Sequence, residues 1–119
     1  MSRAAGSKLG TRVVNTPAGA VRWRDEDGKI AMTLEGSLDE ATGAALLDSV
    51  AKAVAGSPER VDIDVRQITA FEAPGAEALA RCRDMCAQVP AGLHYRTEGG
   101  AGQLALLAAF ERETLVELE

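Results

Sequence analysis

The chain has 119 residues, of which 46% are hydrophobic and 26% charged, and it carries a formal net charge of −5. This length and composition fit one globular domain with a single core, and no apolar run approaches the ~20 residues of a membrane-spanning helix. An acidic chain also lacks the clustered Lys and Arg on which nucleic-acid affinity depends, so we expect neither a nucleic-acid partner nor direct membrane insertion.

The N-terminal segment differs in composition from the rest of the chain. Its first ten residues contain no apolar stretch of the kind found in secretory signals, and residues 1–19 include three glycines and Pro17. We expect residues 1–19 to be a flexible leader, in which Val13 and Val14 hint at a short strand. The domain proper is expected over residues 20–119.

Alternation of apolar and polar residues predicts four strands. Two of them, Val21–Arg24 and Ile30–Glu35, flank the turn-like segment Asp25–Gly28 and form a hairpin. The other two are Val61–Val65 and Leu93–Arg96. Each strand has one apolar and one mainly polar face, which is unlike the continuous apolar strands of a doubly covered parallel sheet. We therefore expect a single-domain α/β fold, with a mixed sheet and helices mainly on one face.

Two helices are predicted between these strands. The first has Asp39 as its N-cap and ends near Gly56, with an apolar stripe opposite its charged residues. The second begins at Pro74, which suits a first helical turn, and continues to Val89 with apolar residues at spacings of mostly three and four.

A third helix is predicted from about Gly102 to Glu113. It contains seven successive apolar residues, Leu104–Phe110, which is more than one buried stripe requires. Residues 114–119 are expected to form a short edge strand or a frayed end. We expect this segment to fold over the apolar helix, and a homodimer in which another subunit covers it is the alternative.

The order of these elements, with the phrase Gly36-Ser37-Leu38-Asp39 after the second strand, resembles the STAS domain, the family of anti-sigma factor antagonists. The family pattern has a G-x-L-D phrase after a strand and an Asp-Ser-x-Gly turn that opens a later helix. Here Val61–Ile68 resembles the strand phrase of the family, and Glu72-Ala73-Pro74-Gly75 stands where the turn would be. The resemblance covers about residues 21–110 and implies a STAS-like domain without catalytic activity.

The resemblance also implies a partner, an anti-sigma factor or a related ATP-binding serine kinase domain. In the family this kinase phosphorylates the Ser of the turn and is thereby released. Ala73 has no hydroxyl and cannot accept phosphate, so we expect a non-phosphorylatable regulator or scaffold; Thr69 is the nearest alternative hydroxyl. The expected partner-binding residues are Asp39, Glu72, Ala73, Pro74 and Gly75.

Two alternatives accompany this interpretation. Glu72 could cap the helix or interact with its dipole, and Ala73 could reflect drift in a module that no longer switches. The domain could instead serve as an accessory subunit of a membrane transporter or bind a small molecule or nucleotide, as some relatives do.

Cys82 and Cys86 lie four residues apart on the apolar face of the second predicted helix. They are too close together for a disulfide framework, and no nearby His or third Cys completes a tetrahedral metal site. We interpret both as core residues of a cytoplasmic protein, and we expect neither a metal nor a cofactor.

Asp62 and Asp64 lie on the polar face of one predicted strand. Such a pair can bind a metal ion, but we expect the commoner arrangement, ion pairs across strands with Arg22, Arg24 or Arg96.

Two further features have structural explanations. His94 is the only histidine and has no paired nucleophile in a recognisable motif, so we expect it on the surface. The run Gly99-Gly100-Ala101-Gly102 could cradle a phosphate, but it lacks the Lys and Ser/Thr of a P-loop, and we expect a plain turn.

Overall fold

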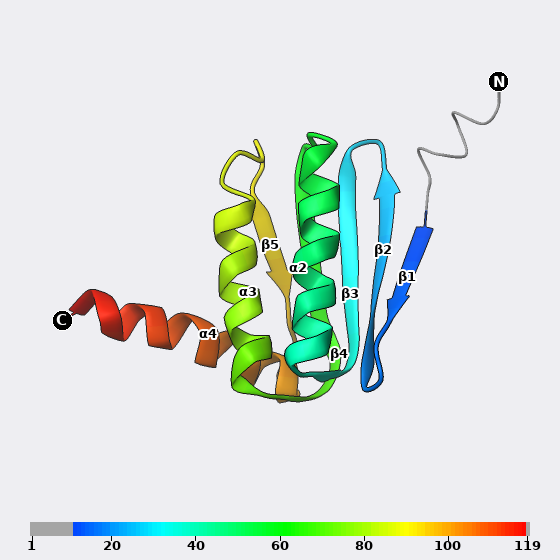
Figure 1. Ribbon diagram of the computed structural model, residues 1–119. Helices are drawn as coiled ribbons and strands as arrows, with labels where there is room; N and C mark the ends of the chain where they lie inside the picture. Colours follow the sequence, from blue (N-terminus) through cyan, green and yellow to red (C-terminus); the bar gives the residue numbers. More distant parts are fainter. Residues whose placement is uncertain (1–10, 119) are drawn as a thin grey trace, which may run out of the picture.

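The computed structural model describes the backbone of residues 11–118 and the side chains of residues 11–110. Five strands form one sheet in the order β1-β2-β3-β4-β5, antiparallel from β1 to β3 and parallel from β3 to β5 (Figure 1). The strands are β1 (Thr11–Asn15), β2 (Gly19–Glu26), β3 (Lys29–Leu38), β4 (Arg60–Phe71) and β5 (Leu93–Arg96). The helices are α2 (Glu40–Ala55), α3 (Ala73–Met85) and α4 (Gly100–Leu118).

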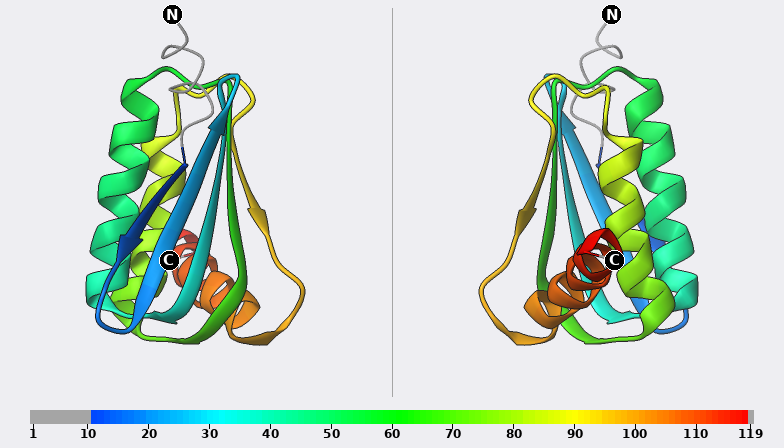
Figure 2. Two further views of the ribbon diagram at one scale, coloured as in Figure 1. Left: turned by 90° about the vertical axis from the view of Figure 1, so that its right-hand side faces the viewer. Right: turned by 90° about the vertical axis from the view of Figure 1, so that its left-hand side faces the viewer.

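The helices α2 and α3 lie side by side on one face of the sheet, and no described helix covers the opposite face, which we call the open face (Figure 2). The alternation in β4 explains this arrangement, because Val61, Ile63 and Val65 are fully buried whereas Asp62 and Asp64 are partly exposed. Burial of one face drives the packing and leaves the polar face to solvent. The expected α/β fold, with a mixed sheet and helices mainly on one face, is confirmed.

The hairpin and the first helix begin where the sequence predicts, but the second helix is shorter. α3 ends at Met85, with Cys86 as its C-cap, rather than at Val89. Val89 is nevertheless buried, so the apolar periodicity continues past the end of the helix. Pro90 disfavours a helical Val89, because the residue before a proline avoids the helical conformation, but the end at Met85 lies four residues earlier.

β1 lies within the segment for which a leader or a short strand is expected. It contains Val13 and Val14 and pairs antiparallel with β2, so the described sheet begins at Thr11. Residues 1–10 lie outside the described residues, and the division of the chain after residue 19 stays a prediction.

The expectation for residues 114–119 is wrong for the described part of this segment, since α4 continues without a break to Leu118. No glycine or proline follows Gly102, so nothing in the sequence ends the helix. Its C-terminal part extends away from the sheet beyond α3 (Figure 1) and does not fold back as a cover. Leu104 and Leu107 are accordingly 58% and 49% exposed.

Two glycines allow helix N-termini to approach the sheet closely. A Cβ on Gly75 would lie 2.0 Å from the carbonyl oxygen of Leu38, and one on Gly102 would lie 2.0 Å from that of Val65. Gly43 of α2 completes the first contact, because its Cβ would lie 3.3 Å from the Cα of Gly75. The first turns of α3 and α4 are therefore packed backbone against backbone on β3 and β4.

Gly75→Ala should lower the free energy of unfolding by roughly 3 kcal/mol, because the new methyl group overlaps backbone that cannot move aside. Urea denaturation measures this. Gly56→Ala is the matched control: its Cβ would lie 3.5 Å from the nearest atom, so we expect a change within about 0.5 kcal/mol. Equal stability of the two variants would show that α3 can move away from β3.

Phe110 packs within the domain. Its ring meets that of Tyr95 edge-on at a centroid distance of 5.6 Å, and the guanidinium of Arg83 lies 5.1 Å from its centroid. Phe110→Glu should therefore destabilise the fold by roughly 2 kcal/mol at any protein concentration, with a lower Tm in thermal scans. Leu107→Glu, at an exposed position of the same helix, should leave the Tm nearly unchanged. A fall in molecular mass by light scattering, with an unchanged Tm, would instead place Phe110 in a dimer interface.

Candidate functional site

Three connections meet at one end of the sheet, the lower end in Figure 1. They are the turn from β1 to β2, the junction of β3 with α2, and the turn from β4 to α3. The last two follow neighbouring parallel strands, whose carboxyl ends lie at the same edge of a sheet. This topology gathers the predicted site residues.

A backbone hydrogen bond joins the last two of these connections. The N–H of Glu72 donates to the carbonyl oxygen of Leu38 over 3.1 Å, and Phe71 is the register partner of Leu38. Asp39 directly follows β3 and Glu72 directly follows β4. The two residues therefore lie next to each other at the end of this strand pair. The structure thus brings Asp39 and the turn 72–75 together, as the sequence predicts; their binding role stays a prediction.

Asp39 is the N-cap of α2, as predicted. Its Oδ1 accepts a hydrogen bond from the backbone N–H of Thr42 over 2.9 Å. This bond favours the ionised carboxylate and holds the pKa of Asp39 below its usual value. One carboxylate of the site is therefore fixed in place and charged at neutral pH.

Glu72 occupies the N-cap position of α3, but its side chain makes no capping hydrogen bond. The suggestion that it caps the helix is therefore wrong for the side chain. Glutamate is one methylene longer than the aspartate of a usual cap and reaches the first-turn N–H groups poorly. The carbonyl oxygen of Glu72 instead accepts hydrogen bonds from the N–H groups of Gly75 and Ala76, at 3.0 and 3.1 Å.

Three of the four residues of the turn are exposed, and the fourth is buried. Glu72, Ala73 and Pro74 are exposed, whereas Gly75 is buried against Leu38. Gly75 is among the residues expected to bind the partner, but its position allows it only to support the turn from beneath. Thr69, four residues before Ala73, is exposed on β4.

One contributor to this end of the sheet has no counterpart in the sequence predictions. The hydroxyl of Thr16, in the β1–β2 turn, lies 2.7 Å from that of Thr42, which is fully buried in the first turn of α2. The N–H of Gly19 donates to the Thr16 hydroxyl at 3.0 Å. The turn is thereby tied to the helix that Asp39 caps. Pro17 and Gly19 are turn-forming residues in this segment and could have indicated the hairpin.

Asp62 and Asp64 form ion pairs, but not across strands with Arg22, Arg24 or Arg96 as predicted. Arg60 binds Asp62 through two nitrogens, and Arg66 binds Asp64 in the same way, each two residues along β4. The backbone N–H of Arg66 also donates to Asp64 at 2.9 Å, where the pairing of β3 with β4 is irregular. These bonds lower the pKa of Asp64. Asp64 thus pairs with the guanidinium of Arg66 and also accepts a backbone hydrogen bond at the irregular position of the strand pair.

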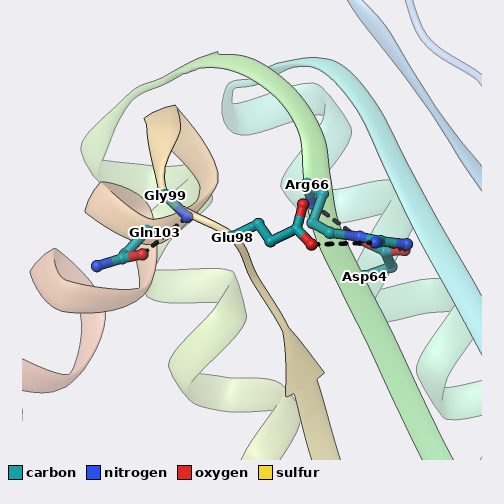
Figure 3. Close-up of polar contacts among 5 residues, drawn as sticks. All are labelled: Asp64, Arg66, Glu98, Gly99 and Gln103. Atoms are coloured by element: carbon teal, nitrogen blue, oxygen red, sulfur yellow. Dashed lines mark hydrogen bonds and ion pairs between the residues drawn. The ribbon is translucent and has the colours of Figure 1, made fainter.

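The loop from β5 to α4 approaches the same arginine (Figure 3). Glu98 lies 3.8 Å from Arg66, and the N–H of Gly99 donates to the side-chain oxygen of Gln103 over 2.8 Å. Gly99 and Gly100 have φ values of +82° and +74°, which glycine tolerates. The plain turn expected for this run is therefore found only up to Gly99, because Gly100, Ala101 and Gly102 begin α4, and the close contact of Gly102 with Val65 was not predicted.

The remaining candidates lie apart from this end of the sheet. Cys82 and Cys86 are free and buried, and burial raises the pKa of Cys82 to about 12. His94 is exposed, with Nε2 lying 2.8 Å from the carbonyl oxygen of Ala91. Within the described part of the chain, no three potential ligands gather as a metal site, and no helix is both long and apolar enough to cross a membrane.

Sequence comparison finds no matching protein-family profile and no matching curated protein. Solved structures do match. An anti-sigma factor antagonist from Mycobacterium paratuberculosis superimposes with a TM-score of 0.69 at 22% identity, covering 85% of this chain and 86% of that one. The resemblance predicted from the sequence is thus confirmed at the level of the fold.

Two larger proteins contain a similar unit. SLC26A9 matches with a TM-score of 0.54 at 13% identity, over 76% of this chain and 17% of that chain. Mglu matches with a TM-score of 0.51 at 17% identity, over 65% of this chain and 19% of that chain. This chain spans less than a fifth of either protein.

The Asp39 cap predicts an acid-sensitive contribution to stability. Because its pKa is lower in the folded state than in the unfolded state, the ionised cap stabilises the fold fully above about pH 4. That stabilisation is lost as the pH falls through the folded-state pKa. Asp39→Asn keeps a capping oxygen but does not titrate, so its unfolding free energy should fall less between about pH 4 and pH 2.

Urea denaturation at several pH values measures this difference. Asp84→Asn, at an exposed position near the end of α3, is the matched control for the same change of side chain outside the cap. If Asp39→Asn lost stability with acid as steeply as the wild type, the Thr42 hydrogen bond would not favour the ionised form.

Proposed function

We propose that this chain is a non-enzymatic protein-interaction module of a partner-switching system, which binds an anti-sigma factor or a related ATP-binding serine kinase domain. The observation that carries the proposal is the meeting of Asp39 with the turn 72–75, on a fold shared with an anti-sigma factor antagonist. The binding surface comprises Asp39, Glu72, Ala73 and Pro74, with Gly75 holding the turn in place.

The form of this surface suits recognition by a rigid partner. Pro74 restricts the turn, Gly75 packs it against β3, and the Asp39 side chain is held by its bond to Thr42. A pre-ordered surface loses little conformational entropy on binding. Because Asp39 and Glu72 both carry carboxylates, the complementary surface should offer Lys, Arg or backbone N–H groups.

Ala73 defines the regulatory character of the module. It is exposed in the first turn of α3 and has no oxygen to accept phosphate. A partner with kinase activity could not end the complex by modifying this position. The module would therefore act as a constant regulator or scaffold, unless Thr69 serves as a displaced acceptor.

The alternative function is that of an accessory subunit of a membrane transporter or a domain that binds a small molecule or nucleotide. One observation favours it, because the same fold forms a small part of two larger proteins. Affinity capture of the tagged chain from its native host, followed by mass spectrometry, separates the two functions. A kinase or anti-sigma factor supports the first, and a membrane permease supports the second.

With the captured protein in hand, Ala73→Asp should weaken binding at least tenfold by calorimetry. The new carboxylate lies beside Glu72 and must lose its water shell when the partner covers the turn, without a partner group placed to pair with it, which costs on the order of a few kcal/mol. Ala87→Asp, the same change at an exposed position beyond the other end of α3, should bind as the wild type does. Equal affinities of all three proteins would move the interface elsewhere.

A phosphorylation assay with the captured protein and ATP examines the same position. The wild type should take up no phosphate between Glu72 and Gly75, and Ala73→Ser should become an acceptor if the captured protein is an active kinase. Stoichiometric phosphate on Thr69 of the wild type would show that the switch has moved rather than disappeared.

A further inference from the structure

The open face of the sheet is the one away from α2 and α3 (Figure 2). Residues of this face line a hollow of about 810 Å³. Its floor is formed by two small residues of β3, Ala31 and Thr33. The strand register places two rows of side chains across it, Arg24–Ala31–Asp62–His94 and Arg22–Thr33–Asp64–Arg96. Charged side chains of β2 therefore lie on one side of the small β3 residues, and charged side chains of β4 and β5 lie on the other.

The hollow is positively charged in an acidic chain. Its lining includes four arginines and two aspartates, which leaves a formal charge of +2 with His94 neutral, against −5 for the chain. The arginines are Arg22, Arg24, Arg60 and Arg96, of which Arg22 binds Glu35 outside the lining at 2.7 Å. Such a local reversal of sign attracts anions to this face.

The carboxylates of the hollow are already engaged. Arg60 binds Asp62 at 3.0 Å through each of two nitrogens, and Arg66 binds Asp64 at 3.0 and 2.8 Å. Both carboxylates thus have bidentate partners on their own strand. A cation would have to break these pairs, so the arrangement favours an anion as the ligand.

Two arginines retain donors for a ligand. Arg24 has only a distant contact with Glu26, at 3.8 Å between two side chains that are each 57% exposed. Arg96 has no ion pair within 4 Å in the part of the chain that the structure describes, although it contributes to the field at Asp64. They lie on β2 and β5, three strand spacings or about 14 Å apart across the sheet, and two residues or about 7 Å apart along the strands.

We propose that this hollow binds a small molecule that carries at least two phosphate groups, held at one side by Arg24 and at the other by Arg96. Guanidinium groups bind phosphate oxygens through paired hydrogen bonds, and two separated arginines select an extended anion over a single one. The site lies on a different surface from the turn 72–75 and does not depend on the proposed protein partner.

Nucleic acid is a less suitable ligand for this face. The Trp23 side chain belongs to the covered face, since its register partner is the buried Met32, and the Tyr95 hydroxyl donates to the carbonyl oxygen of Leu79 in α3. Neither ring therefore forms a platform on which bases could stack in the open hollow.

Calorimetric titration of the full chain with sodium tripolyphosphate tests the proposal. We expect saturable 1:1 binding, weaker binding of inorganic phosphate, and a roughly tenfold loss of affinity in Arg24→Gln and in Arg96→Gln. Arg81→Gln, which removes the same charge from the exposed surface of α3, should change the affinity less than twofold. Circular dichroism verifies that each variant is folded, and Ala73→Asp should bind tripolyphosphate as the wild type does.

Three results would overturn the proposal. The first is no binding of tripolyphosphate at millimolar concentration. The second is an equal loss of affinity in Arg81→Gln, which would indicate attraction by net charge alone. The third is tighter binding of a single-stranded oligonucleotide that Arg24→Gln and Arg96→Gln both weaken, which would make this face a nucleic-acid surface instead.

Discussion

The arrangement at the end of the sheet depends on one contact between main chains. Gly75 lies so close to the carbonyl group of Leu38 that no side chain fits between them, and Gly43 brings α2 to the same point. The first turn of α3 is consequently held against the end of β3, with Glu72 bonded to Leu38. The exposed residues Glu72, Ala73 and Pro74 are held in this position because the buried Gly75 has no side chain.

Elements with a strong one-sided pattern could be predicted from the sequence. The buried and exposed sides of β4 and the capping of α2 by Asp39 are local signals that need no knowledge of the rest of the chain. β1 is only hinted at, because all five of its residues are exposed and no alternation marks them. The prediction for the C-terminal segment is wrong because Leu115, Val116 and Leu118 suit a helix as well as a strand.

The topology of the strands allowed part of the candidate site to be predicted from the sequence. The rest depends on contacts between residues far apart in the chain, which the sequence pattern does not reveal. Asp39 and Glu72 each follow a strand of the same parallel pair, so the element order alone places them together. The contact between Thr16 and Thr42 joins residues 26 positions apart and leaves no periodic trace in the sequence. Asp62 and Asp64 each have arginines both along their own strand and on neighbouring strands. The sequence does not decide which of these arginines forms the ion pair.

The ion pairs of β4 have a consequence for how the open face can change in evolution. Arg60 with Asp62, and Arg66 with Asp64, are satisfied within one strand. They therefore impose no complementary charge on β3 or β5, and they do not specify which strand lies beside them. On this face only Arg22 of β2 and Glu35 of β3 form an ion pair across strands among the described residues, at 2.7 Å, so the positions of β4 and β5 are specified by the apolar face. Neighbouring strands are free to gain or lose charged residues on the solvent side, so this face can diverge among relatives while the fold stays constant.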